Sequence, residues 1–210
     1  MQRRENVVYS KLQRGYVAGQ LEARYCAEPM SSILQVPVPE ESLLRTYRGG
    51  ARPDRWGNQG DCFSVSVERV VSLADFVFAF YTSPVFRVER WILALVAKSP
   101  STDAQARAVA DESSRDFALW QVAERTDTQL LMCDRYEMTR SWFRVVPQGD
   151  GRTVLQFGSA VAAHRDQKTG AASMKRGFRW LMGFHVLYSK VLLGAASRRV
   201  MKGFAPNAEH

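Results

Sequence analysis

The sequence predicts an α+β fold in which antiparallel strands and two short helices precede one long C-terminal helix. Apolar and polar residues alternate from residue 61 to 71 and in several runs after residue 116, which is typical of half-buried strands. Apolar residues then recur with helical period from Ser173 to Gly203. The 210 residues fit one domain, and a hydrophobic fraction of 46% is sufficient for a core.

Residues 1–57 are expected to form an N-terminal arm that is partly helical, and residues 58–204 the main domain. Apolar residues at rough helical spacing predict helices at Asn6 to Tyr25 and Glu40 to Tyr47. The run from Gly49 to Asp61 is rich in glycine and polar residues. Because such a composition is typical of a loop, the domain boundary is placed there.

One strand and two helices are predicted to open the main domain. The strand covers residues 61–71, and Ser72 is a suitable N-cap for the helix that follows it. Pro84 suits the first turn of a second helix, where the missing N–H is not needed. Helical spacing up to Lys98 places one apolar set on a common face: Val85, Val88, Trp91, Ile92 and Leu95. The polar stretch 101–114 reads as a surface helix or a loop.

From Asp116 onward the pattern becomes strand, turn, strand. Strands are predicted at 117–125, 129–134, 139–147 and 152–164, with a hairpin turn at 148–151. Alternation puts Ser141 and Phe143 on one face, and Arg140 and Trp142 on the other, where we expect them to point outward. Gly158 indicates a bulge or the close approach of another backbone.

The last helix, from Ser173 to Gly203, has a broad apolar side. Ser173 can cap its start, and Gly203 is a stop signal. The apolar arc is wider than a surface helix needs, so we expect contacts on two sides. His185 lies in the middle of that arc. It is either a general base or hydrogen-bond donor to a buried ligand, or a core histidine satisfied by a neighbour.

The order of these elements resembles the START-like helix-grip superfamily of polyketide cyclases, plant allergen-type proteins and lipid-transfer domains. The resemblance is carried by DCFSVSVERVVSLADFVFAFYTSPVFRVERWIL (61–93), CDRYEMTRSWFRVVP (133–147), TVLQFGSAV (153–161) and GFHVLYSKVLL (183–193), and is closest to a bacterial family of unknown function. It implies a curved antiparallel sheet that wraps the last helix and leaves a cavity between them. That superfamily usually has six strands after the helix pair and four are recognised here, so a reduced sheet and a cystatin-like arrangement stay open.

The candidate site is this cavity, where a small apolar molecule would bind. Ligand pockets have mostly apolar walls and a few placed polar groups. The predicted lining consists of Ser141, Phe143, Phe157, Ser159, Leu181, His185 and Tyr188. The alternative is that the small residues only let the helix approach the sheet. A binding module is favoured over an enzyme, with a cyclase- or dehydratase-like activity that uses His185 or Tyr188 as the second hypothesis.

The chain is basic, with a net charge of +8, and many of its cations lie in the last helix. The basic face of this helix indicates either a solvated helix surface or a weak contact with an anionic membrane or another partner. No zinc-finger, basic-zipper or RNA-recognition signature accompanies the charge, so no nucleic-acid partner is predicted.

The three cysteines, Cys26, Cys62 and Cys133, show no paired spacing, which argues against disulfides and a zinc site and suits a reducing, cytoplasmic location. Three scattered histidines predict no metal site, and no catalytic or cofactor motif is recognised. No signal peptide and no transmembrane run is recognised. The sequence does not distinguish a monomer from a homodimer.

Overall fold

A computed structural model describes residues 32–50, 60–96, 98–162 and 176–203, and the side chains of the last helix from Leu187 onward. The chain divides into two compact units, Met1–Ser32 and Ile33–His210. The elements described below belong to the second unit. The helix predicted from Asn6 to Tyr25 lies outside the described residues.

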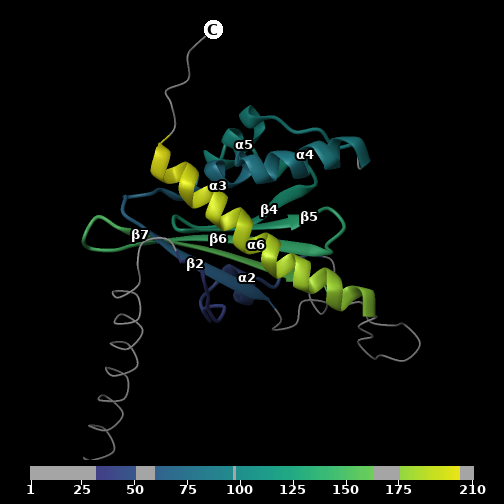
Figure 1. Cartoon of the computed structure of the whole chain (residues 1–210). Coiled ribbons are helices and arrows are strands. Elements are labelled where there is room, and N and C mark those ends of the chain that lie inside the picture. Colours follow the sequence, from purple (N-terminus) through teal and green to yellow (C-terminus); the bar gives the residue numbers. More distant parts are fainter. Residues whose placement is uncertain (1–31, 51–59, 97, 163–175, 204–210) are drawn as a thin grey trace, which may run out of the picture. The chain divides into compact units, whose positions relative to one another are not determined.

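A seven-stranded antiparallel sheet is the central layer of the second unit (Figure 1). Its spatial order is β1-β2-β7-β6-β5-β4-β3, and every neighbouring pair is antiparallel. The strands are β1 (Leu34–Gln35), β2 (Asp61–Val67), β3 (Asp116–Phe117), β4 (Trp120–Arg125), β5 (Gln129–Asp134), β6 (Thr139–Pro147) and β7 (Thr153–Val161). The described helices are α2 (Leu43–Thr46), α3 (Leu73–Tyr81), α4 (Pro84–Val96), α5 (Asp103–Ala110) and α6 (Arg176–Lys202).

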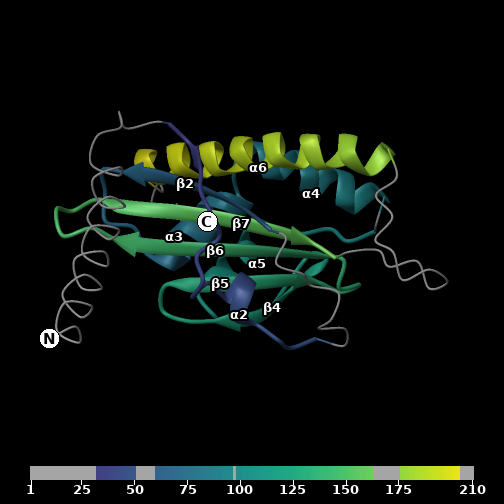
Figure 2. The same ribbon diagram turned by 90° about the horizontal axis from the view of Figure 1, so that it is seen from below.

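Helices cover both faces of this sheet. The long helix α6 contacts β2 and β7. On the same side of the sheet, α3 contacts α6, α5 and β6. The short helix α2 contacts β5, β6 and β7 from the opposite side, as Figure 2 shows. The predicted α+β class is confirmed. The structure has an antiparallel sheet, a helix pair after the first long strand and a long C-terminal helix that the sheet grips.

The ends of the helices lie where local chemistry predicts them. The Ser72 hydroxyl accepts a hydrogen bond from the Asp75 N–H, which caps α3, and α4 begins at Pro84. Gly203 follows α6 with a φ of +73°, a left-handed conformation that favours glycine at a helix end. These three predictions are confirmed.

The strand count after the helix pair differs from the four that the sequence indicates. The run predicted as one strand at 117–125 is divided into β3 and β4, because Ala118 adopts a φ of +53° and the chain turns back on itself. The polar stretch before it contains α5, which begins with a capping box between Thr102 and Gln105. This stretch is therefore a helix and adds no further strand.

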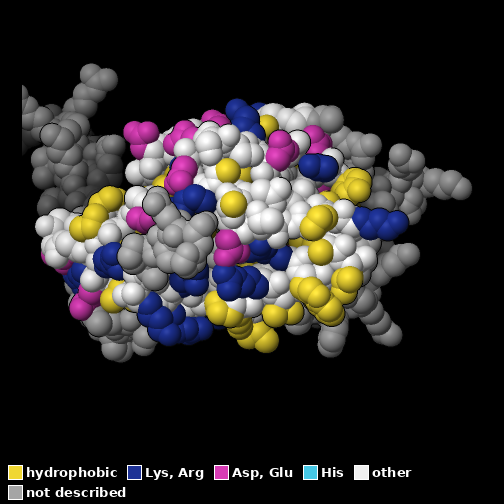
Figure 3. Space-filling model, turned by 90° about the horizontal axis from the view of Figure 1, so that it is seen from above, with side chains coloured by type: hydrophobic (Ala, Val, Ile, Leu, Met, Phe, Trp, Pro, Cys, Tyr) yellow, Lys and Arg dark blue, Asp and Glu magenta, His cyan; other side chains and the backbone are white. Residues whose placement is uncertain are grey.

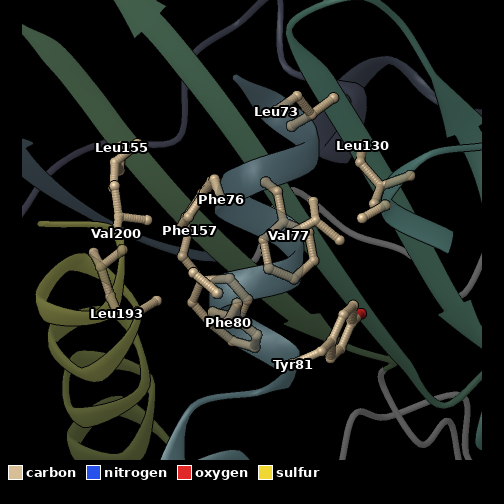
Figure 4. Packing of buried hydrophobic residues seen from close by; sticks show 14 of the residues in the cluster. Leu73, Phe76, Val77, Phe80, Tyr81, Leu130, Leu155, Phe157, Leu193 and Val200 are labelled. Atoms are coloured by element: carbon tan, nitrogen blue, oxygen red, sulfur yellow. The ribbon is translucent and has the colours of Figure 1, made fainter. Parts of the chain in front are cut away.

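An aromatic wedge from α3, defined here as Phe76, Phe80 and Tyr81, fills the space between the sheet and α6. The Phe80 ring lies 4.8 Å from that of Phe143 and 4.6 Å from that of Phe157, between centroids. Leu193 and Val200 of α6 are buried in the same cluster (Figure 4). Each such buried side chain contributes about 1.5–3 kcal/mol, so this cluster is a major source of stability.

The opposite face of the sheet is also buried, which corrects the expectation that Arg140 and Trp142 point outward. Trp142 is 0% exposed and Arg140 is 2% exposed. The Trp142 indole donates to Gln129 Oε1 at 2.8 Å, and the same oxygen accepts the free Leu43 N–H in the first turn of α2 at 3.0 Å. Alternation assigns a residue to a face, but it does not reveal that residues 36–49 cover that face.

Arg140 is held under this cover by contacts with the segment that follows α2. Its guanidinium donates to the Gly49 carbonyl at 3.1 Å and lies 4.9 Å from the Tyr47 ring centroid. The strand β1 also pairs with β2. Residues 33–50 therefore add a strand to the sheet and cover one of its faces. They precede the domain boundary predicted near residue 57, and that boundary stays a prediction.

Gly158 permits the close packing of Trp142. A Cβ at Gly158 would lie 2.9 Å from Trp142 Cε3 and 3.0 Å from the Asp61 carbonyl oxygen. The predicted close approach of another backbone is confirmed, and it comes from β2.

Substitution of Gly158 by alanine is expected to lower the free energy of unfolding by about 1–3 kcal/mol, since the added methyl group must displace backbone or the indole. Gly149 is the matched control, because a Cβ there meets no described atom within 4 Å. G149A is expected to stay within about 0.5 kcal/mol of wild type in urea unfolding. Equal stability of G158A and G149A would contradict the packing described here.

Candidate functional site

The structure brings together four of the predicted site residues on the helix-facing side of the sheet. Ser141 and Ser159 are Cα partners across β6 and β7, and so are Phe143 and Phe157. The two phenylalanine rings lie 5.3 Å apart between centroids. The predicted juxtaposition therefore exists, whereas ligand binding by these residues stays a prediction.

Phe143 and Phe157 are buried members of the core rather than bare walls of a cavity. Both rings contact Phe80 of the aromatic wedge. Side chains fill the space between the sheet and α3 at this point. A ligand near these two rings would therefore contact them at the edge of the packed core.

Ser159 has a protein partner that the sequence did not indicate. Both its hydroxyl and its N–H donate to Asp61 Oδ1, and the N–H bond measures 3.1 Å. Ser141 is half-buried beside it. The sheet thus continues from aromatic to polar side chains along its helix-facing side, in the order Phe157, Ser159 on β7 and Phe143, Ser141 on β6.

Tyr188 donates a hydrogen bond from its hydroxyl to Glu89 Oε2, which joins α6 to α4. Burial raises the pKa of the Glu89 carboxyl, and the hydrogen bond from Tyr188 opposes that rise without cancelling it. Burial and the neighbouring Glu89 charge raise the pKa of the Tyr188 phenol. Burial is the largest cause of both shifts.

Tyr81 and Trp120 carry two further polar atoms that are buried. Burial first, and the Glu89 charge second, raise the pKa of the Tyr81 phenol, so Tyr81 lies within electrostatic reach of Glu89. The Tyr81 hydroxyl and the Trp120 indole N–H are both buried and have no hydrogen-bond partner among the described residues. Both rings pack against Phe86: the distance between ring centroids is 4.9 Å for Tyr81 and 5.9 Å for Trp120.

Leu181 and His185 belong to α6, but their side chains lie outside the described part of the chain. His185 precedes Tyr188 by three residues, so the two share one side of the helix. Their predicted role in ligand binding stays a prediction.

Glu89, Tyr81, Trp120 and Asp61 were not recognised as site residues from the sequence. Glu89 carries a signal in retrospect, because it lies four residues after Val85 and three before Ile92, inside an apolar stripe. A carboxyl at such a position must be solvated or paired. Tyr81 gives no comparable signal, since a tyrosine beside Phe80 reads as ordinary core.

Three other features of the described residues bear on function: metal ligands, a reactive thiol and membrane-spanning helices. The described residues contain no group of three His, Cys, Asp or Glu side chains that could hold a metal ion. Burial raises the pKa of the Cys62 thiol to about 12, so it is not a thiolate nucleophile near neutral pH. None of the helices in the described ranges is long and apolar enough to cross a membrane.

Two solved structures show a distant similarity to this chain. No protein-family model and no curated protein sequence matches the chain. A conserved protein of unknown function from Enterococcus faecalis matches 73% of this chain over 80% of its own, with a TM-score of 0.35 and 11% identity. CalU16 from Micromonospora echinospora matches 82% of this chain over 97% of its own, with a TM-score of 0.26 and 11% identity. Such TM-scores do not establish a shared fold, so START-like membership stays a prediction.

Replacing Glu89 by glutamine is expected to change how stability depends on pH. Because the folded protein raises the pKa of Glu89 above its ordinary value of 4.5, the protonated carboxyl favours the folded state. This contribution to the free energy of unfolding is fully present below pH 4.5 and is lost as the pH rises through the folded-state pKa. E89Q keeps an oxygen that accepts from Tyr188 and stays neutral throughout. The free energy of unfolding of E89Q relative to wild type should therefore increase from about pH 4 to about pH 8.

The measurement is urea unfolding across this pH range, with E68Q as the control that removes one exposed carboxylate. An E89Q difference that is flat, or that turns toward wild type as pH rises, would show that Glu89 is not held in a desolvating site.

Proposed function

We propose that the protein is a START-like binding module that holds a small apolar molecule in a site bounded by the sheet, α4 and α6. One observation carries this proposal: the Tyr81 hydroxyl and the Trp120 indole N–H are buried without a partner among the described residues. Buried polar groups in folded proteins are nearly always hydrogen-bonded, and an unpaired one costs about 1–3 kcal/mol. A bound ligand is a suitable partner for both.

The surrounding side chains restrict the chemistry of that ligand. The Trp120 indole can only donate, so the ligand must offer a hydrogen-bond acceptor there. Phe86, Phe117 and Phe143 surround Tyr81 with apolar rings. The proposed ligand is therefore mostly apolar and carries at least one acceptor oxygen.

The polar end of the site is formed by Glu89 and Tyr188. The Tyr188 phenol and the Glu89 carboxyl offer further polar atoms inside an apolar setting, which suits a hydroxyl or carbonyl of the ligand. His185 and Leu181, on the preceding turns of α6, belong to this proposed lining. Ser141 does so from β6, whereas Ser159 contributes less because Asp61 already accepts its hydroxyl.

Native mass spectrometry of protein purified from its own host is expected to reveal a co-purifying apolar molecule. In Y81F the bound fraction should fall, with an affinity loss of about tenfold for one lost hydrogen bond. Y47F is the matched control, because Tyr47 lies on the opposite face of the sheet against Arg140. It should retain the ligand.

The unliganded proteins distinguish a site from a packing defect. Removing an unpaired buried hydroxyl is expected to raise the stability of free Y81F by about 1–3 kcal/mol, even as ligand is lost. If Y81F is more stable while wild type carries no molecule, the hydroxyl is an unsatisfied core group and the binding proposal is wrong.

A second candidate is an enzyme of the cyclase or dehydratase kind, and the hydrogen bond between Tyr188 and the half-buried Glu89 carboxyl is the observation that favours it. A carboxyl whose pKa is raised by desolvation can exchange a proton nearer neutral pH than an exposed one. Conversion of the extracted ligand by wild type and Y47F, with loss in E89Q or H185A, is expected of such an enzyme. Recovery of the ligand unchanged from wild type would remove this candidate.

A further inference from the structure

The helix α4 exposes the apolar face that the sequence pattern identifies. Trp91 is 66% exposed, Leu95 is 62% exposed, and Val88 and Ile92 are exposed beside them. The reason is the orientation of the helix: α4 contacts the core through Phe86, and Arg90 is turned inward to Ser101 and Asp103. The side that would ordinarily be buried is therefore directed to solvent.

The neighbouring helix α6 extends this surface. Leu187 is 60% exposed and Val191 is also exposed, and both lie next to Tyr188, which is bonded to Glu89 of α4. We call the set Val88, Trp91, Ile92, Leu95, Leu187 and Val191 the α4–α6 patch. The face shown in Figure 3 carries hydrophobic side chains of this kind, with lysine and arginine side chains beside them.

Exposed cations follow the patch residues along both helices. The α6 sequence contains no Asp or Glu, and its Arg198 and Lys202 are exposed. Lys98, just after α4, is exposed as well. The acid of α4, Glu89, is turned toward Tyr188, and Asp103 is paired with Arg87 and Arg90. Among these described residues, the exposed charges that form no ion pair with another described residue are the cations Lys98, Arg198 and Lys202.

We propose that the α4–α6 patch docks on the surface of an anionic lipid bilayer. Tryptophan and branched aliphatic side chains partition into the boundary between headgroups and acyl chains, and lysine and arginine bind the lipid phosphates. The α4 helix, about 20 Å long, would lie in the plane of this boundary. A second copy of the chain fits less well, because two such patches would bring like charges together.

The α4–α6 patch and the proposed ligand site share no residue, since the patch residues are exposed to solvent whereas Tyr81 is buried. Isolated exposed apolar residues are normal on proteins, but several on two neighbouring helices, with Trp91 among them, are typical of an interaction surface.

Vesicle flotation tests the proposal with phosphatidylcholine alone and with phosphatidylcholine mixed with phosphatidylglycerol. The full chain is expected to float with the anionic vesicles at low ionic strength and to be partly released by salt. The double variant W91S/L95S should reduce the partition coefficient about tenfold or more. V70S is the matched control, since Val70 is an equally exposed apolar residue in the loop after β2.

Charge and insertion are tested separately. K202E should weaken binding to anionic vesicles, whereas R48E, at an exposed position just after α2 on the other face of the sheet, should not. Brominated lipids should quench tryptophan fluorescence of wild type, and W91F should float normally with reduced quenching. Thermal melts of W91S/L95S confirm that it is folded.

Three results would overturn the docking proposal. One is the absence of flotation at low ionic strength, and another is an equal loss in V70S and W91S/L95S. The third is concentration-dependent dimerisation without lipid that W91S/L95S abolishes, which would assign the patch to self-association instead.

Discussion

The packing of the α3 aromatic wedge against β6 and β7 determines what the rest of the domain can do. Phe80 contacts both Phe143 and Phe157, and aromatic pairs of this kind add about 0.5–1.5 kcal/mol each beyond the burial of area. Because the wedge packs between the sheet and α6, the proposed ligand is placed beside it, where Tyr81, Glu89 and Tyr188 contribute polar atoms.

The helix α4 reverses the usual arrangement of an amphipathic surface helix. Arg90 is directed inward and bonded to Asp103, and Glu89 is directed to Tyr188, whereas Trp91 and Leu95 face solvent. Placing charges inward requires partners, and the structure provides them for both. The helix therefore has two contrasting sides: its inner side carries Glu89 of the candidate site, and its outer side is an exposed apolar surface.

The sequence predicts the elements of this fold better than their surroundings. Ser72, Pro84 and Gly203 mark helix ends through local chemistry, and alternation places Ser141 and Phe143 on one face of a strand. The same reasoning fails where a distant segment decides the outcome. Trp142 is buried because α2 and Gln129 cover it, and no local pattern reveals that contact. The α4 stripe is recognised as apolar, but periodicity does not show whether it is buried.

The two proposals become physically connected through α4, although each is tested by different residues. Glu89 and Trp91 are two positions apart, so their side chains leave the helix in directions that differ by about 200°. The candidate site and the proposed bilayer contact are thus separated by roughly the width of one helix, about 10 Å. An apolar ligand that moves through water loses about 25 cal/mol for each Å² of surface it exposes. A site placed one helix away from a bilayer shortens that path, which gives a physical reason for one helix to carry both surfaces.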